Sequence, residues 1–204
     1  WFFPEGLRGD QVKVKHWMAS KVVSIHKEAS IQEALSVMKQ VSIRHLPVVG
    51  QDRNLIGWVT DADLRGVLIA SMLEELTLAD VMIRKPITAD PDMSMDEVAQ
   101  IVLEKRIGGL PVVEKGKLVG VITVVDVLSA FITRMGMLPY SSRLDVEVSP
   151  EKGELSKVLE IIEHNGGNVI SFCRMPVTEH GAHASYSIRL KKTDLSPMVT
   201  ALAN

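Results

Sequence analysis

Apolar positions along this chain change their spacing in a regular order, and each change predicts an element. Ser30 is followed by Glu33 and by apolar residues at helical spacing, which is the capping pattern of a helix start. Ser94 and Glu97 repeat this pattern 64 residues later. After each predicted helix come two short runs rich in Val and Ile, joined by polar turns at 50–54 and 114–117. Extended segments are expected before the helices at 22–25 and 86–89, and further helices start at Thr60 and Thr123.

The order β-α-β-β-α is therefore present twice, and the sequence itself repeats. Leu-Pro-Val-Val begins at Leu46 and at Leu110, and Gly-x-x-Thr-x-x-Asp ends at Asp63 and at Asp126, so the offset is 64 and then 63. Met18 and Met82 keep the offset of 64. A duplicated unit predicts two copies of one fold packed face to face, with two equivalent clefts between them. This organisation favours a ligand-sensing module over an enzyme.

The last third of the chain has a different pattern. Segment 144–148 alternates like a strand, 153–164 has helical spacing, and 169–175 and 184–190 are expected to pair as a hairpin. With a last helix at 195–202, this is one strand short of a ferredoxin-like β-α-β-β-α-β domain. The predicted organisation is α+β, with repeats at 12–75 and 76–138, a linker at 139–143 and a third domain at 144–204.

Composition narrows the class of protein. The 204 residues are 46% hydrophobic with a net charge of −2, which gives no electrostatic reason to expect nucleic acid or an anionic membrane as a partner. The single cysteine, Cys173, excludes an internal disulfide. No P-loop, metal-ligand cluster or catalytic constellation is present in the sequence. We expect a cytoplasmic protein that is not an enzyme and needs no metal or cofactor.

Thr60 with Asp63, and Thr123 with Asp126, are the clearest candidates for chemistry. One interpretation is purely structural, because a Thr N-cap with an acid three residues later stabilises a helix by about 1 kcal/mol. The other adds a ligand: the helix N-terminus and the Thr hydroxyl suit phosphate, and the carboxylate suits ribose hydroxyls. Repetition of the motif favours the second interpretation.

These motifs resemble the signature of tandem cystathionine-β-synthase (CBS) domains. The resemblance implies two clefts that bind AMP, ADP, ATP, NAD or S-adenosylmethionine. It implies that Asp63 and Asp126 hold ribose and that Thr60 and Thr123 approach phosphate. The residues that it places around adenine are Val23, Ser24, Ile87 and Thr88, together with the strands at Leu46, Pro47, Leu110 and Pro111.

The two copies differ just before Leu-Pro-Val-Val. The first has Arg44 and His45, and the second has Gly108 and Gly109. Arg44 is either a phosphate clamp or a solvated surface charge, and a phosphate near His45 would favour its protonated form. The glycine pair permits close approach of the backbone instead. The two phosphate environments are therefore expected to be unequal.

Residues 144–204 resemble an ACT domain, a small regulatory fold, on Val146–Val148, Pro150–Leu155 and Gly167–Ile170. The resemblance implies an amino acid or other metabolite bound at Glu151, Lys152, Gly153 and Asn168; the alternative is a turn followed by a helix start. A CBS pair followed by an ACT domain resembles the acetoin-utilisation (AcuB) family. The function that this implies is nucleotide-dependent control of a partner enzyme by a homodimer. The alternative is a scaffold that binds nothing.

Overall fold

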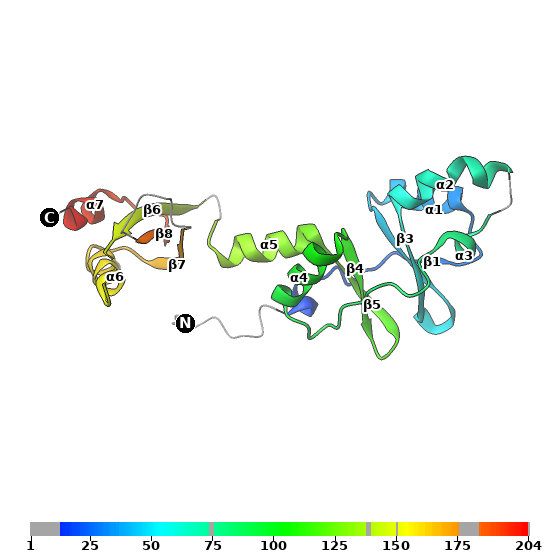
Figure 1. The fold of residues 1–204 in the computed structure, drawn as a ribbon, viewed down its shortest axis with the longest axis horizontal. Coiled ribbons are helices and arrows are strands. Elements are labelled where there is room, and N and C mark those ends of the chain that lie inside the picture. Colours follow the sequence, from blue (N-terminus) through cyan, green and yellow to red (C-terminus); the bar gives the residue numbers. More distant parts are fainter. Residues whose placement is uncertain (1–12, 74–75, 138–139, 150, 176–183, 204) are drawn as a thin grey trace. The chain divides into compact units, whose positions relative to one another are not determined.

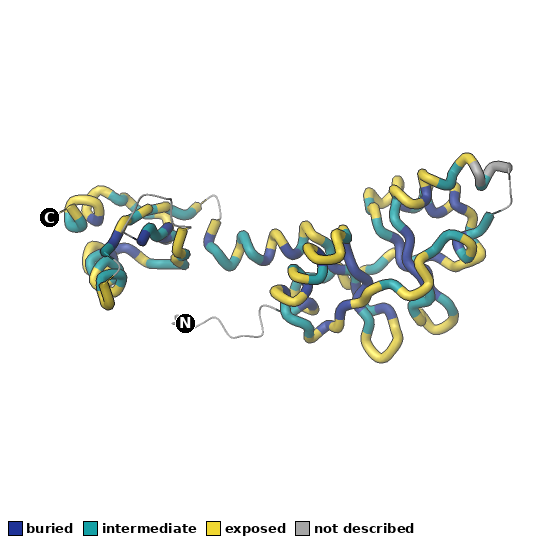
Figure 2. The backbone as a smooth tube through the Cα atoms, viewed as in Figure 1, coloured by how far each residue is buried: buried dark blue, intermediate teal, exposed yellow. Residues whose placement is uncertain are grey.

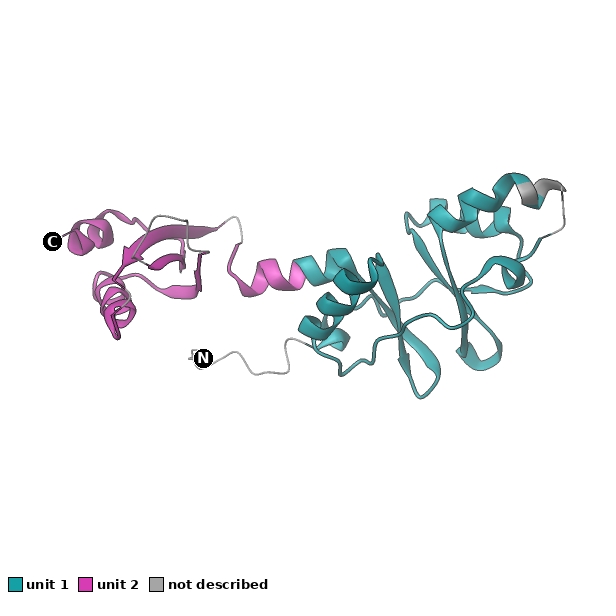
Figure 3. Ribbon diagram, in the orientation of Figure 1, with its two compact units in different colours: residues 1–128 teal, residues 129–204 magenta. Residues whose placement is uncertain are grey.

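The computed structural model describes residues 13–73, 76–137, 140–149, 151–175 and 184–203. The chain forms two compact units, Trp1–Leu128 and Ser129–Asn204, which Figure 3 colours separately. The division falls inside helix α5 (Val124–Arg134), whereas the sequence places the end of the second repeat at residue 138.

The first repeat folds in the predicted order (Figure 1). Its elements are β1 (Ile25–His26), α1 (Ile31–Gln40), β2 (His45–Val49), the 3₁₀ helix η3 (Gln51–Arg53), β3 (Leu55–Thr60) and α2 (Asp61–Leu73). The sheet order is β1-β2-β3, with β1 parallel and β3 antiparallel to β2. Ser30 caps α1 as predicted, since its side chain accepts a hydrogen bond from the Glu33 N–H at 3.1 Å.

The second repeat contains α4 (Met95–Lys105), the antiparallel strands β4 (Gly109–Glu114) and β5 (Lys117–Thr123), and the start of α5. Ser94 and Glu97 form the full reciprocal capping box. The expected strand at 86–89 is reduced to one parallel bridge, between Ala89 and Val112, and the strand at 22–25 to the two residues of β1. Just before each of these segments, the chain pairs with the other repeat.

Each repeat contributes a segment that packs on the other repeat. These segments are an N-terminal arm (residues 13–21) and a middle arm (residues 77–84). In the N-terminal arm, the 3₁₀ helix η2 (Val14–His16) lies against the second repeat, where the Val14 N–H donates to the Met93 carbonyl at 3.0 Å. Further along this arm, Ala19 pairs with Val121 of β5. Figure 1 shows η2, in dark blue, beside α4.

The middle arm makes the equivalent bonds to the first repeat. Helix α3 (Leu78–Val81) begins with Leu78, whose N–H donates to the Ala29 carbonyl at 3.0 Å, and Ile83 pairs with Trp58 of β3. Leu78 and its counterpart Val14 are both fully buried. Each repeat is therefore completed by the arm that precedes the other repeat in the sequence.

Two glycines of the repeated motif make this exchange possible. A Cβ atom at Gly57 would overlap the Met82 sulfur and lie 2.9 Å from its Cγ. Gly120 stands in the same relation to Met18, whose Cγ would be 3.0 Å from the added atom. Met18 and Met82, which the sequence shows at the repeat offset of 64, are thus the side chains that pack each arm against the sheet of the other repeat.

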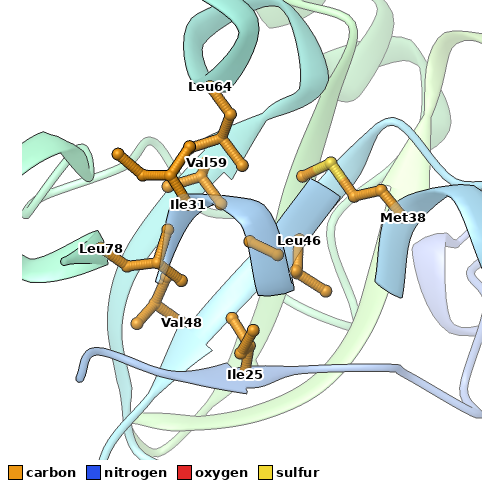
Figure 4. Packing of buried hydrophobic residues seen from close by; sticks show 9 residues of the cluster. Ile25, Ile31, Met38, Leu46, Val48, Val59, Leu64 and Leu78 are labelled. Carbon is orange, nitrogen blue, oxygen red and sulfur yellow. The ribbon is translucent and has the colours of Figure 1, made fainter. Parts of the chain in front are cut away.

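Buried residues gather on the strands and on the inner faces of the helices (Figure 2). In the first repeat one cluster joins both helices, the sheet and the middle arm, as Figure 4 shows. Its members are Ile25, Ile31, Ala34, Met38, Leu46, Val48, Val59, Leu64 and Leu78.

The second unit contains β6 (Ser141–Val148), α6 (Glu154–His164), β7 (Val169–Arg174), β8 (Ala184–Lys191) and α7 (Ser196–Leu202). The predicted pairing of the last two strands is confirmed, and the antiparallel sheet has the order β6-β8-β7. Strand β6 starts three residues earlier than expected, because Ser141 and Arg143 continue the ladder with β8. The predicted linker at 139–143 therefore ends inside a strand. The core of this unit is formed by Ile162, Ile188, Leu190 and Met198.

Candidate functional site

The first candidate site, called the Thr60 site, comprises Arg44, His45, Thr60, Asp61, Asp63 and Arg65. Thr60 ends β3, and its hydroxyl donates to Asp63 Oδ2 at 2.6 Å while accepting from the Asp63 N–H at 3.2 Å. The single hydroxyl hydrogen is therefore directed to the carboxylate and not to a ligand. The other carboxylate oxygen, Oδ1, has no protein donor among the described contacts and is available to accept from a sugar hydroxyl.

Charged side chains surround this turn. The Asp61 N–H donates to the Arg44 carbonyl at 2.9 Å. This bond joins the loop between α1 and β2 to the start of α2. Arg65 Nε pairs with Asp61 Oδ2 at 2.7 Å, and this hydrogen bond is the main reason that the pKa of Asp61 is lowered, with the charge of Arg44 a smaller cause. Arg44 is exposed and shares this neighbourhood without an ion pair of its own among the described contacts.

His45 is the half-buried member of the Thr60 site. Its ring stacks on Trp58 at 5.6 Å between centroids. Burial, helped by the charge of Arg44 and opposed by that of Asp63, lowers the pKa of His45 below its usual range. The side chain also reaches the second repeat, because a Cβ at Gly108 would lie 2.8 Å from His45 Nε2. A side chain at Gly108 would therefore force the His45 ring to move, and the close approach of this backbone to a phosphate stays a prediction.

The second candidate site, called the Thr123 site, comprises Gly108, Gly109, Thr123, Val124, Asp126 and Leu128. Thr123 donates to Asp126 Oδ2 through both its hydroxyl, at 2.6 Å, and its backbone N–H, at 2.8 Å. The Val124 N–H donates to the Gly108 carbonyl at 3.1 Å, which matches the Asp61–Arg44 bond of the first site. The junction of strand and helix is therefore closed by the same backbone hydrogen bond at both sites, whereas only Thr123 also donates its backbone N–H to its aspartate.

Side chains at matching positions differ in character. Where the Thr60 site has Asp61 paired with Arg65, the Thr123 site has Val124 and Leu128, with 42% and 57% of their surfaces exposed. Sequence reasoning noted the Arg44–Gly108 difference but missed this second one. The signal was the spacing of Asp61 and Arg65, four residues apart at a helix start, which favours an ion pair.

The remaining residues predicted to contact a ligand fall into two groups. Those on the strands are buried: Leu46, Pro47, Gly109, Leu110 and Pro111. Those before the first helices keep surface in solvent: Val23, Ser24, Ile87 and Thr88. Exposed Val23 and Ile87, at 37% and 42%, are the apolar side chains among these that remain available to a flat base.

The candidate residues of the second unit are not brought together by any described contact. Glu151, Lys152, Gly153 and Asn168 are all exposed, and Gly153 has a φ of 99° immediately before α6. A groove of about 280 Å³ lies elsewhere, and none of these four residues lines it. It runs beside β6, between α6 and α7, and is lined by Leu144, Asp145, Val146, Glu147, Val158, Val199, Leu202 and Ala203.

The part of the chain that the structure describes contains neither a metal-binding cluster nor a membrane-spanning helix. No group of three or more His, Cys, Asp or Glu side chains in that part of the chain is arranged to hold a metal ion. None of the helices described there has the length and apolar character to cross a membrane.

Comparison with known proteins decides the family. A family model described as CBS domain matches residues 14–70 and again residues 78–133, more than half of the chain. The chain belongs to the CBS domain family. The predicted tandem pair is confirmed, whereas assignment of the second unit to the ACT family stays a prediction. CBS domains are typically regulatory, and no catalytic family is indicated for this chain.

Similar proteins support the same reading. A CBS domain-containing protein of Dictyostelium discoideum is 32% identical over 144 residues, which cover 65% of this chain and 99% of that protein. The CBS domain pair of protein MJ0100, solved with 5′-methylthioadenosine and S-adenosyl-L-methionine, is 31% identical. It matches with a TM-score of 0.54 over 58% of this chain and 94% of that one. A protein assigned to acetoin utilization (AcuB) from Vibrio cholerae is 30% identical, with a TM-score of 0.56 over 62% of this chain and 94% of that one.

Proposed function

We propose that the CBS pair is a regulatory sensor that binds an adenine nucleotide of the AMP, ADP or ATP type. The observation that carries this proposal is the Thr-x-x-Asp turn, which is repeated, with the same closing backbone hydrogen bond, at both strand–helix junctions. The similar MJ0100 pair was solved with two adenosine derivatives, which supports the choice of an adenosine ligand.

The geometry suggests how the ligand is held. Asp63 and Asp126 each use Oδ2 for their threonine, so Oδ1 accepts from ribose hydroxyls. Val23 and Ile87 offer apolar surface to adenine. Because both threonine hydroxyls donate to their aspartates, a phosphate bound here relies on backbone N–H groups and on Arg44 more than on Thr60.

The structural change caused by nucleotide binding controls a partner enzyme. Binding alters packing between the two repeats, which exchange their arms, and a homodimer presents this change to the partner. The second unit, as an ACT-like domain, binds a small metabolite or an amino acid. The alternative is a scaffold whose two CBS sites stay empty, and it is favoured by the fact that the Thr–Asp pairs already act as helix caps without any ligand.

Equilibrium dialysis against AMP, ADP and ATP separates these two functions, with Asp63→Asn and Asp126→Asn as matched variants. Each substitution keeps the size of the side chain but weakens acceptance from two sugar hydroxyls. A sensor loses affinity in the altered site with little change in stability. A ligand at one hundred times its dissociation constant also adds about 2.7 kcal/mol of stability to the native state. Absence of binding by the parent protein, with variants that only unfold more easily, would support the scaffold.

A further inference from the structure

The two sites of the CBS pair are closed by the same backbone hydrogen bond but have opposite side-chain chemistry. At the three positions that differ most, the Thr60 site has Arg44, Asp61 and Arg65. The Thr123 site has Gly108, Val124 and Leu128 at the same places, as the matching backbone bonds establish. When Asp63 and Asp126 are included, these positions of the Thr60 site hold two guanidinium groups and two carboxylates. The same positions of the Thr123 site hold one carboxylate and no cation.

We propose that the Thr60 site takes an adenosine bearing a 5′-phosphate, whereas the Thr123 site takes an adenosine whose 5′ substituent carries no phosphate. This inference rests on the proposed function and divides it between the two sites. The ribose is held in the same way in both, by Asp63 or Asp126, and the 5′ substituent decides which site a ligand occupies.

The Thr60 site offers a phosphate one guanidinium group, that of Arg44, which is not already paired with a carboxylate among the described contacts. Arg44 is exposed, lies close enough to lower the pKa of Asp61, and is not engaged in an ion pair among the described contacts. Its planar, permanently charged group suits two phosphate oxygens at once. Arg65 is held beside the same turn by its 2.7 Å bond to Asp61. Burial lowers the pKa of His45, which is half-buried beside this turn, and the negative charge of a phosphate would raise it.

The Thr123 site offers the opposite environment. Gly108 has no side chain to reach a phosphate, and a larger residue there would have to displace the His45 ring. Val124 and Leu128 lie one helical turn apart at the start of α5 and expose apolar surface. A phosphate placed between this surface and the Asp126 carboxylate would lose hydration without gaining a cation, which is unfavourable. An apolar 5′ group such as a methylthio group gains contact instead.

Calorimetric titration of the whole chain with AMP and with 5′-methylthioadenosine tests the division. Asp63→Asn and Asp126→Asn report which site each ligand occupies, and Arg44→Ala reports the phosphate contact. Lys39→Ala, which removes an exposed positive charge at the end of α1 in the same repeat, is the matched control.

We expect AMP affinity to fall at least about tenfold in Asp63→Asn and in Arg44→Ala, the change that loss of one charge-assisted hydrogen bond produces. AMP affinity should be unchanged in Asp126→Asn and Lys39→Ala. Binding of 5′-methylthioadenosine should depend on Asp126 and be insensitive to Arg44. If AMP depends equally on both aspartates, or if Arg44→Ala leaves it unchanged, the division between the sites is wrong although nucleotide sensing stands. If neither ligand binds the parent chain the division is wrong, and if ADP and ATP also fail to bind, the proposed function fails as well.

Discussion

The close packing of Met82 on Gly57 gives a quantitative test that the two arms are exchanged between the repeats. Gly57→Ala places a methyl group where the Met82 sulfur lies, inside a buried strand, and overpacking of this kind costs about 1–3 kcal/mol. Met82→Ala alone empties part of the same space, and because Met82 is only half-buried we expect a loss of about 2 kcal/mol, the lower end of the range for such truncations. In the double variant, the new methyl group fills the vacated space. The two effects should therefore be less than additive by about 1–2 kcal/mol.

The opposite pairing supplies the control. Gly57→Ala combined with Met18→Ala should be additive to within about 0.5 kcal/mol, because Met18 lies on Gly120 in the other repeat. Urea unfolding followed by tryptophan fluorescence, to which the buried Trp58 beside Gly57 contributes, measures all of these free energies. Coupling of Gly57 to Met18 instead of to Met82, or additivity in both combinations, would show that the arms are not exchanged as described.

Three further measurements follow from the structure. Hydrogen bonds from Ser94 hold the pKa of Glu97 below its usual value near 4.5, so ionised Glu97 stabilises the native state at neutral pH. This stabilisation is lost as the pH falls from about 4.5 to the lowered pKa of the folded state. Over this pH range the melting temperature of Glu97→Ala should fall less steeply than that of the parent chain, and equal slopes would contradict the argument. Asp126→Ala should cost about 1 kcal/mol in urea unfolding, because two hydrogen bonds from Thr123 are lost; no loss would exclude the capping role. The second helices of both repeats expose large apolar side chains, Ile69 on α2 and Val125 and Leu128 on α5, so we expect light scattering to give at least a dimer and Ile69→Glu to weaken it. A mass of 22.5 kDa for the parent chain would refute this.

Local patterns were sufficient to predict most of the elements. Ser30 and Ser94 mark helix starts because capping depends on residues within one turn, and the Val-rich runs form hairpins because their partners are adjacent in sequence. The Thr–Asp pairs were also predictable, since their geometry is set within four residues.

The exchange of arms was not predictable in the same way. Periodicity shows that Val14 and Leu78 are buried, but it does not show which repeat buries them. The repeat offset of Met18 and Met82 pointed to a shared role, and only the contact with Gly120 and Gly57 reveals what that role is. The resemblance places the strands of Leu46 and Leu110 around adenine; the structure adds that both side chains are fully buried, and their proximity to a ligand stays a prediction.

The reciprocal arms also bear on how such a chain arises. A single repeat on its own would expose the part of its sheet and core that the arm of the other copy covers. Its own arm would have no sheet to pack against. Two identical single-repeat chains that trade arms about a two-fold axis satisfy both needs at once. The present chain has the arrangement of that dimer with its two protomers joined end to end. Cutting it between residues 73 and 76 should therefore give two fragments that stay together, each holding a part of the other's interior.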